Sequence, residues 1–154
     1  MLPTTTDRVP QATDEELNER IRRQTEASIA RHAGSREDIE RRLAELDREW
    51  DIERTLEANA ASISLVGIAL AAIVSRRFLI LPAAVAGFLL QHALQGWCPP
   101  LPLFRRLGIR TQAEIEEERH ALKALRGDYA EIPRVEAAVP GQSHGARAFE
   151  AAQR

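Results

Sequence analysis

The stretch that decides the fold is residues 58–97, which reads ANAASISLVGIALAAIVS, then Arg76-Arg77, then FLILPAAVAGFLLQHALQGW. The two uncharged segments, 58–75 and 78–97, hold 18 and 20 residues. As helices they would reach roughly 27 and 30 Å, which is enough to cross the hydrocarbon core of a bilayer. Neither segment has a polar face, and a helix that is apolar all round is buried in a large core or in lipid. These residues predict a transmembrane helical hairpin over 58–97 with a tight turn at 76–77.

The rest of the chain is strongly charged. Of 154 residues, 44 are charged, and residues 58–104 contain only two of these. The remaining 107 residues offer too few apolar side chains to wrap two apolar helices, which disfavours a soluble bundle with a buried hairpin, the alternative fold. A net charge of −2 excludes a bulk polycation for nucleic acid, and a single cysteine excludes an intramolecular disulfide framework or a cysteine-cluster metal site.

The segments around the hairpin are predicted to be helical and polar, with disordered chain ends. A capping box at Thr13-x-x-Glu16 begins the first helix, another at Ser35 begins the second, and a third at Thr111-x-x-Glu114 begins the last. With no helix breaker before residue 58, we expect the second helix to continue into the membrane. The expected organisation is disorder over 1–12, a polar helix over 13–34, an amphipathic helix over 35–57, a connector over 98–111, a helix over 112–127 and a disordered tail over 128–154. The fold class is therefore all-α, a two-helix transmembrane hairpin flanked by cytoplasmic amphipathic helices.

An apolar stripe in the second helix predicts a contact surface. Ile39, Leu43, Leu46 and Trp50 recur at spacings of four, three and four, which places them on one helical face. This stripe would face the C-terminal helix, a second copy of the chain or another protein.

The distribution of arginine predicts the orientation of the hairpin. Six arginines flank the hairpin, against two in the turn; they are Arg48, Arg54, Arg105, Arg106, Arg110 and Arg119. Basic residues are enriched on the cytoplasmic side of membrane proteins, so both termini are expected in the cytoplasm.

Counting outward from the turn assigns each residue of the hairpin a depth. Gly67 and Gly87 fall at matched depth near the middle of the membrane, and Ala71 and Ala83 extend their small-residue faces, which predicts close helix packing. A polar layer near the cytoplasmic boundary is expected from five residues. They are Asn59, Ser62, Gln91, His92 and Gln95. Two interpretations of the layer stay open, hydrogen bonding between the helices or a site in which neutral His92 accepts a proton or binds a ligand.

The segment after the hairpin carries a motif. Gly96-x-Cys98-Pro99 is followed by Leu107-Gly108-Ile109-x-Thr111. In this order, directly after a short hairpin, the motif resembles the YgaP-like transmembrane domain family over residues 55–112. The resemblance implies a bacterial inner-membrane module that occurs alone or behind rhodanese-type sulfurtransferase domains. The Pro-rich connector and the long charged flanks depart from the family's usual form.

Cys98 has three interpretations. It is a small apolar residue at the interface, a thiol that accepts sulfur or senses redox state, with Arg105 and Arg106 favouring the thiolate, or a ligand of haem or a metal. The sequence indicates neither a base nor a resolving cysteine for that chemistry.

The leading functional prediction is a small, non-enzymatic membrane protein that anchors or recruits a partner through its helical flanks. Its expected partners are the lipid bilayer, a second copy in a homodimer, and a sulfurtransferase or another protein; nucleic acid is not expected. No catalytic residue, cofactor or metal is predicted. The alternatives are a sulfur-transfer or redox accessory that works through Cys98 and a soluble helical adaptor with a buried apolar hairpin.

Overall fold

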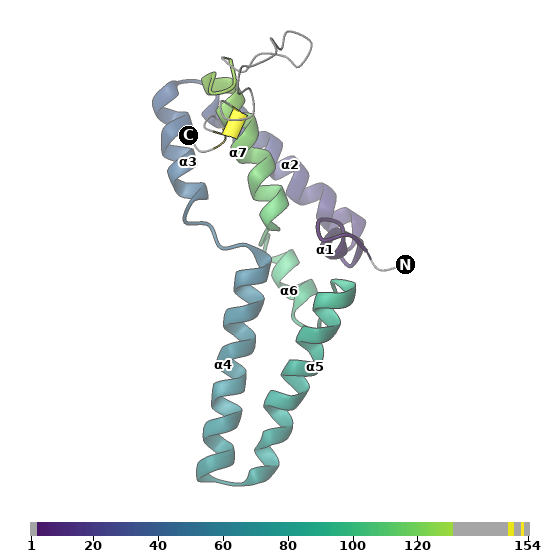
Figure 1. Ribbon diagram of the computed structural model, residues 1–154. Helices are drawn as coiled ribbons and strands as arrows, with labels where there is room; N and C mark the ends of the chain where they lie inside the picture. Colours follow the sequence, from purple (N-terminus) through teal and green to yellow (C-terminus); the bar gives the residue numbers. More distant parts are fainter. Residues whose placement is uncertain (1–2, 131–147, 150–151, 153–154) are drawn as a thin grey trace, which may run out of the picture. The chain divides into compact units, whose positions relative to one another are not determined.

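The computed structural model describes residues 3–130, 148, 149 and 152, and these residues form helices and turns without a strand among them (Figure 1). The predicted all-α class is confirmed. Most of the predicted disordered tail over 128–154 lies outside the described residues. The elements are α1 (Arg8–Gln11), α2 (Glu15–His32), α3 (Arg36–Leu46), α4 (Ile52–Ile73), the 3₁₀ helix η1 (Arg76–Leu79), α5 (Ile80–Gln95), α6 (Leu101–Arg106) and α7 (Gln112–Arg126).

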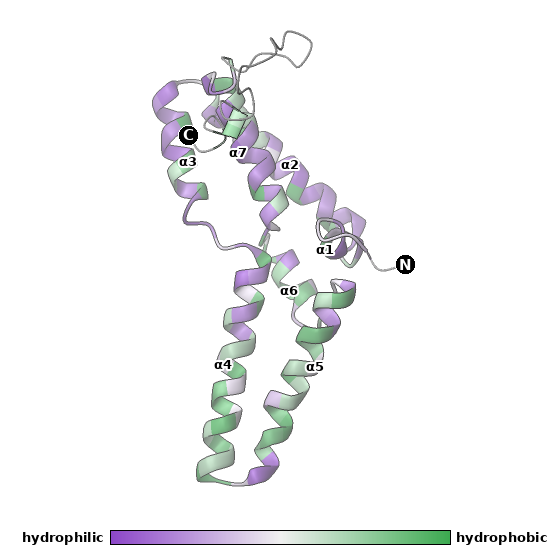
Figure 2. Ribbon diagram, in the orientation of Figure 1, coloured by the Kyte–Doolittle hydropathy of each residue, from purple (hydrophilic) through white to green (hydrophobic). Residues whose placement is uncertain are grey.

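The described chain divides into two compact units. Unit 1 contains the residues up to Thr25 together with Glu49–Ile115, and so includes α1, the hairpin of α4 and α5, and α6. Unit 2 contains Glu26–Arg48 and the described residues from Glu116 onward, and so includes α3 and most of α7. Both units are built from helices. The apolar residues are concentrated in α4 and α5, which belong to unit 1 (Figure 2).

The apolar hairpin of unit 1 consists of α4 and α5 joined by η1. The two stretches Ile52–Ile73 and Arg76–Gln95 are long and apolar enough to cross a membrane. The turn lies at Val74 and Ser75, two residues earlier than predicted. It forms there because α4 ends at Ile73 with Val74 as its C-cap, and the Ser75 hydroxyl then accepts a hydrogen bond from the backbone N–H of Arg77 and so begins η1. We call the other end of the hairpin, where α4 begins and α5 ends, its base.

The predicted continuous helix over 35–57 is wrong, because the helix breaks before the hairpin. α3 ends at Leu46 and α4 begins at Ile52. The Asp51 side chain caps the new helix by accepting from the N–H of Arg54 at 2.7 Å, and the Ile52 N–H donates to the carbonyl of Arg110 at 2.8 Å. These two N–H groups at the start of α4 have no partner within the helix, so the bonds to Asp51 and Arg110 stabilise the break between α3 and α4.

The prediction of disorder over 1–12 is wrong for residues 3–12, where the chain forms α1 and packs on the hairpin base. Val9 is only 2% exposed and belongs to an apolar cluster with Ile52, Leu56 and Leu101. Gly96, in the left-handed region with φ 76°, lies directly beneath α1, since a Cβ atom built there would be 2.0 Å from the carbonyl oxygen of Arg8. The missing side chain of Gly96 therefore allows α1 to dock.

Most of the predicted contact stripe of α3 is buried. Ile39, Leu43 and Leu46 are buried, whereas Trp50 lies in unit 1 and is 49% exposed. The Trp50 ring instead lies under the guanidinium of Arg54, 4.3 Å from its centroid. Three of the four stripe residues are therefore not available to an external partner in this structure.

A buried carboxylate connects the helices of unit 2. Glu118 of α7 is fully buried, accepts from the Ser28 hydroxyl at 2.6 Å and pairs with the Arg42 guanidinium at 2.8 Å. A buried charge is tolerated only when it is paired and hydrogen-bonded, and all three groups meet here. The predicted caps of α3 and α7 are confirmed, because Ser35 and Thr111 accept from the N–H groups of the residues three positions later.

Candidate functional site

The small residues of the hairpin do not form the predicted mutual contact. A Cβ atom on Gly67 would lie 2.7 Å from Cδ of Pro82, so α4 approaches α5 closely at that level. Gly87 has nothing within 4 Å of its Cβ position. Ala71 is half-buried and Ala83 is exposed. The displaced turn explains the difference, since it brings Gly67 opposite Pro82 and leaves the Ala83–Gly87 face of α5 uncovered within the chain.

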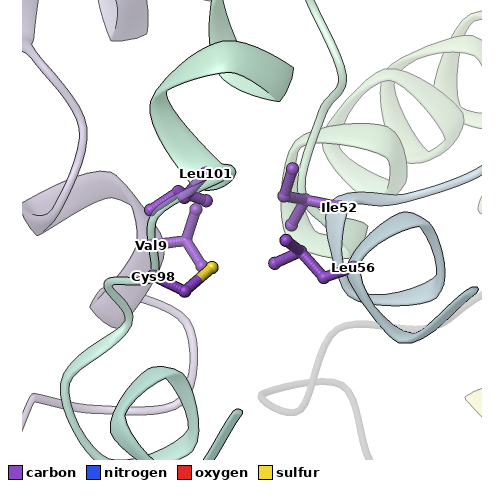
Figure 3. Close-up of a cluster of buried hydrophobic side chains, with 5 residues drawn as sticks. All are labelled: Val9, Ile52, Leu56, Cys98 and Leu101. Atoms are coloured by element: carbon purple, nitrogen blue, oxygen red, sulfur yellow. The ribbon is translucent and has the colours of Figure 1, made fainter. Parts of the chain in front are cut away.

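Cys98 lies at the hairpin base, in the core of unit 1. The residue is 3% exposed and packs in the cluster of Val9, Ile52, Leu56 and Leu101 (Figure 3). The left-handed turn at Gly96 ends α5 with its N–H bonded to the carbonyl of His92 at 2.8 Å, and this turn folds the chain back toward the helix. This turn thereby brings Cys98, which is six residues after His92, back to the level of His92.

A chain of polar contacts runs from α1 to α5 beside this cluster. His92 is 4% exposed, and its Nε2 lies 3.0 Å from Oε2 of Glu53 in α4. The other carboxylate oxygen of Glu53 accepts from Nη2 of Arg8 at 2.8 Å. Arg8 also donates to the carbonyl of Ala93 at 3.2 Å. Three segments far apart in sequence therefore fix the orientation of one imidazole ring.

The contacts of the ring determine what it does chemically. A carboxylate only accepts hydrogen bonds, so the proton of a neutral His92 resides on Nε2, facing Glu53. Nδ1 then carries a lone pair, and this atom is buried without a hydrogen bond of good geometry among the described residues. The Cys98 thiol lies beside the ring within interaction range. His92, which the sequence offered as a proton acceptor without linking it to Cys98, therefore lies next to the thiol and is oriented by Glu53.

Arg105, expected to favour the thiolate, has other partners. Its guanidinium is buried and forms two hydrogen bonds to Glu114, both at 2.7 Å, and a third to Asn18 at 2.9 Å. Arg106 is exposed. Burial raises the pKa of the Glu114 carboxyl, but hydrogen bonds from Arg105 and the Thr111 N–H outweigh it, and the net pKa lies below the ordinary value. The positive charge of Arg105 is thus neutralised by an ionised partner.

A cavity of about 430 Å³ lies between α4, α5 and the segment that carries Cys98. Its walls are almost entirely apolar and include Ala60, Ile63, Val85 and Phe88, with Cys98 as part of the lining. Pockets of this size with one or two polar groups are typical of sites for small apolar molecules.

The five residues of the predicted polar layer separate in the structure. Asn59 lines the cavity, and His92 pairs with Glu53. The Ser62 hydroxyl donates to the carbonyl of Ala58 in its own helix at 2.7 Å. Gln91 is half-buried and Gln95 is exposed. The layer therefore supplies one buried functional group, His92, whose partner Glu53 lies six residues before Asn59 in α4.

Within the described part of the chain, no group of three or more His, Cys, Asp and Glu side chains is placed to hold a metal ion. No family model matches the chain, and neither a curated protein nor a solved structure is significantly similar to it.

Proposed function

We propose that this chain is a small integral membrane protein that anchors or recruits a partner without catalysing a reaction. The observation that carries the proposal is the exposure of the hairpin. In the 18-residue apolar windows of the two stretches, only 17% and 6% of the residues are buried inside the chain. A monomeric soluble protein does not leave an apolar surface of that extent in water, so lipid is the natural cover.

The ends of the hairpin support the same conclusion. Both tryptophans of the chain, Trp50 and Trp97, flank the hairpin base and are partly exposed. Leu103 and Leu107 at α6 are also exposed, by 58% and 69%. Tryptophan is enriched in the headgroup layer, and α6 presents an apolar edge beside it. The charged segments then lie in the aqueous phase, on the cytoplasmic side of a bacterial inner membrane if arginine sets the orientation.

Extraction with alkaline carbonate tests the anchoring. The full chain is expected to stay in the membrane pellet, and release into the supernatant would favour the soluble adaptor, whose hairpin an oligomer covers. Protease treatment of sealed inverted vesicles tests the orientation. Digestion of both termini is expected, and protection of either would overturn it.

A pair of matched variants sharpens the distinction between lipid and water. Val66 of α4 and Leu125 of α7 are 56% and 57% exposed. In lipid, Val66→Lys costs about 2.5–3.5 kcal/mol, whereas a lysine in an equally exposed position in water costs little. Val66→Lys should reduce membrane retention, and Leu125→Lys should leave it unchanged. Equal retention of the two variants would contradict the proposal.

Self-association through α5 is part of the proposed function. Ala83 and Gly87 form an exposed small-residue face, and such faces allow helices to approach closely in membranes. Because Gly67 is already covered by Pro82, the face for a second copy is on α5 alone. In-membrane crosslinking of Gly87→Leu is expected to lose the dimer, and an unchanged dimer would remove this interface.

A second candidate function is sulfur transfer or redox sensing at Cys98, as the resemblance to the YgaP-like family implies. The observation that favours it is the His92 ring beside the thiol. Incubation of the purified chain with a persulfide donor should add sulfur to the wild type and not to Cys98→Ser. No added mass on the wild-type protein would exclude this candidate.

A further inference from the structure

We propose that Cys98 is a site of S-acylation, at which the thiol takes a long-chain acyl group from an acyl thioester and the cavity between α4 and α5 holds the chain. The proposal goes beyond anchoring and recruitment and does not depend on a protein partner. Three observations carry it: a thiol in the wall of an apolar cavity, a buried imidazole beside that thiol whose Nδ1 has no hydrogen-bond partner among the described residues, and a carboxylate that fixes the imidazole.

The cavity determines which acyl group fits. Its volume of about 430 Å³ is bounded by apolar side chains such as Ala60, Ile63 and Phe88, and Cys98 is in its lining. A hydrocarbon chain attached to the Cys98 sulfur would run between the two helices and cover these apolar walls. A short or polar acyl group would leave the apolar walls uncovered.

The polar groups supply the proton transfer. Nδ1 of His92 takes the proton of the Cys98 thiol, while the bond from Nε2 to Glu53 stabilises the protonated ring. The thiolate sulfur attacks the carbonyl carbon of the donor thioester, the bond from that carbon to the donor sulfur breaks, and the departing thiolate recovers the proton from His92. The products are an acyl thioester on Cys98 and a free donor thiol, so no oxidant or reductant is required.

The test uses the purified full chain in detergent micelles with palmitoyl or octanoyl coenzyme A as the probe. Intact-mass measurement should show one palmitoyl adduct that hydroxylamine removes and that Cys98→Ser does not form in hydroxylamine-sensitive form. His92→Gln should slow the palmitoylation roughly 10²-fold, as expected for loss of a general base. Absence of the adduct, with a thiol that still reacts with maleimide after denaturation, would overturn the proposal.

Two alanines of α5 test the role of the cavity without changing the polar groups. Ala84 lines the cavity and Ala86 does not, although both are exposed. Ala84→Phe should lower the rate with palmitoyl coenzyme A relative to octanoyl coenzyme A about tenfold or more, and Ala86→Phe should leave that ratio unchanged. Equal ratios in the two variants, or a His92→Gln rate equal to the wild type, would show an adventitious thiol reaction and overturn the proposal. A sulfur adduct from a persulfide donor has a different mass, so the two fates of Cys98 are distinguishable.

Discussion

Replacing Gly96 with alanine should detach α1 from the hairpin base. The added Cβ would lie 2.0 Å from the carbonyl oxygen and 2.3 Å from the carbonyl carbon of Arg8, and backbone atoms cannot move aside as a flexible side chain does. The left-handed conformation of residue 96 adds about 1–2 kcal/mol for any residue with a Cβ. Loss of Val9 from the core removes about 1.5–3 kcal/mol more. The docked state should therefore lose about 2.5–5 kcal/mol.

Hydrogen exchange of the full chain in detergent micelles measures this loss directly. The amides of Gln11, Ala12 and Thr13 are hydrogen-bonded within the α1 region. A change of 3 kcal/mol corresponds to roughly a hundredfold loss of protection at ~1.4 kcal/mol per factor of ten, provided that exchange occurs through local opening.

Gly127→Ala is the matched control, because Gly127 also has a positive φ, of 92°, but nothing lies within 4 Å of its Cβ position. Gly127→Ala should have only the free-energy cost of placing a residue with a Cβ at positive φ. The amide hydrogen exchange of α1 should stay unchanged. Equal exchange of α1 in the two variants would refute the close contact between Gly96 and Arg8.

Glu114→Gln should lower the unfolding free energy by about 3–5 kcal/mol, because it leaves the buried Arg105 without its carboxylate partner. Thermal or denaturant unfolding in micelles measures this loss. A loss of less than about 1 kcal/mol would contradict the ion pair between Arg105 and Glu114. Because the folded pKa of Glu114 lies below its ordinary value of 4.5, the wild-type ion pair contributes fully above about pH 4.5 and loses its contribution as pH falls through the folded pKa. Unfolding of Glu114→Gln should thus depend less on pH in this acidic range, and parallel curves would exclude that linkage. Gly67→Leu should open the hairpin and reduce resistance to protease at the turn, since its Cβ would lie 2.7 Å from Pro82; resistance equal to that of Gly87→Leu would argue against this packing.

Local signals in the sequence predicted the hairpin and the caps of α3 and α7, whereas the hydroxyl of Thr13, also predicted as a cap, donates to the carbonyl of Val9. The two apolar runs are long and nearly uncharged, and the spacing of Ser35 and Thr111 to the acidic residues that follow is a short-range pattern. Such features depend on a few neighbouring residues, which is why α5 and α7 lie close to their predicted positions and α3 begins where it was predicted to begin.

The candidate site depends on contacts that no local pattern contains. Glu53 and His92 are 39 residues apart, and Arg8 is 45 residues before Glu53. Glu53 stands among other charged residues in the sequence, so no pattern distinguishes it from the other acidic residues that precede the hairpin. Val9 is a lone apolar residue between prolines and polar residues, so no hydrophobic periodicity predicts that it is buried. The sequence did single out Cys98 and His92, but as separate features rather than as neighbours.

In α2, two buried polar residues extend a helical face that begins with hydrophobic residues, and the sequence did not suggest that face. Leu17 and Ile21 of α2 are followed on the same face by Thr25 and Ser28, and all four are buried. In a count of hydrophobic positions the stripe ends at Ile21. The two hydroxyl groups bond to charged partners, Thr25 to Arg110 and Ser28 to Glu118, which removes the cost of burying them.

The docking of α1 imposes an order on the biosynthesis of this protein. Arg8 leaves the ribosome long before its partner carbonyl at Ala93, which lies 85 residues later in the chain. Val9 likewise packs against Leu101, beyond the second apolar helix. The N-terminal segment therefore has no native place to bind until both helices of the hairpin have been made and the chain has turned at Gly96. Closure of α1 over that turn marks the completion of the hairpin, and nascent chains that stall before it expose Val9 and an unpaired Glu53.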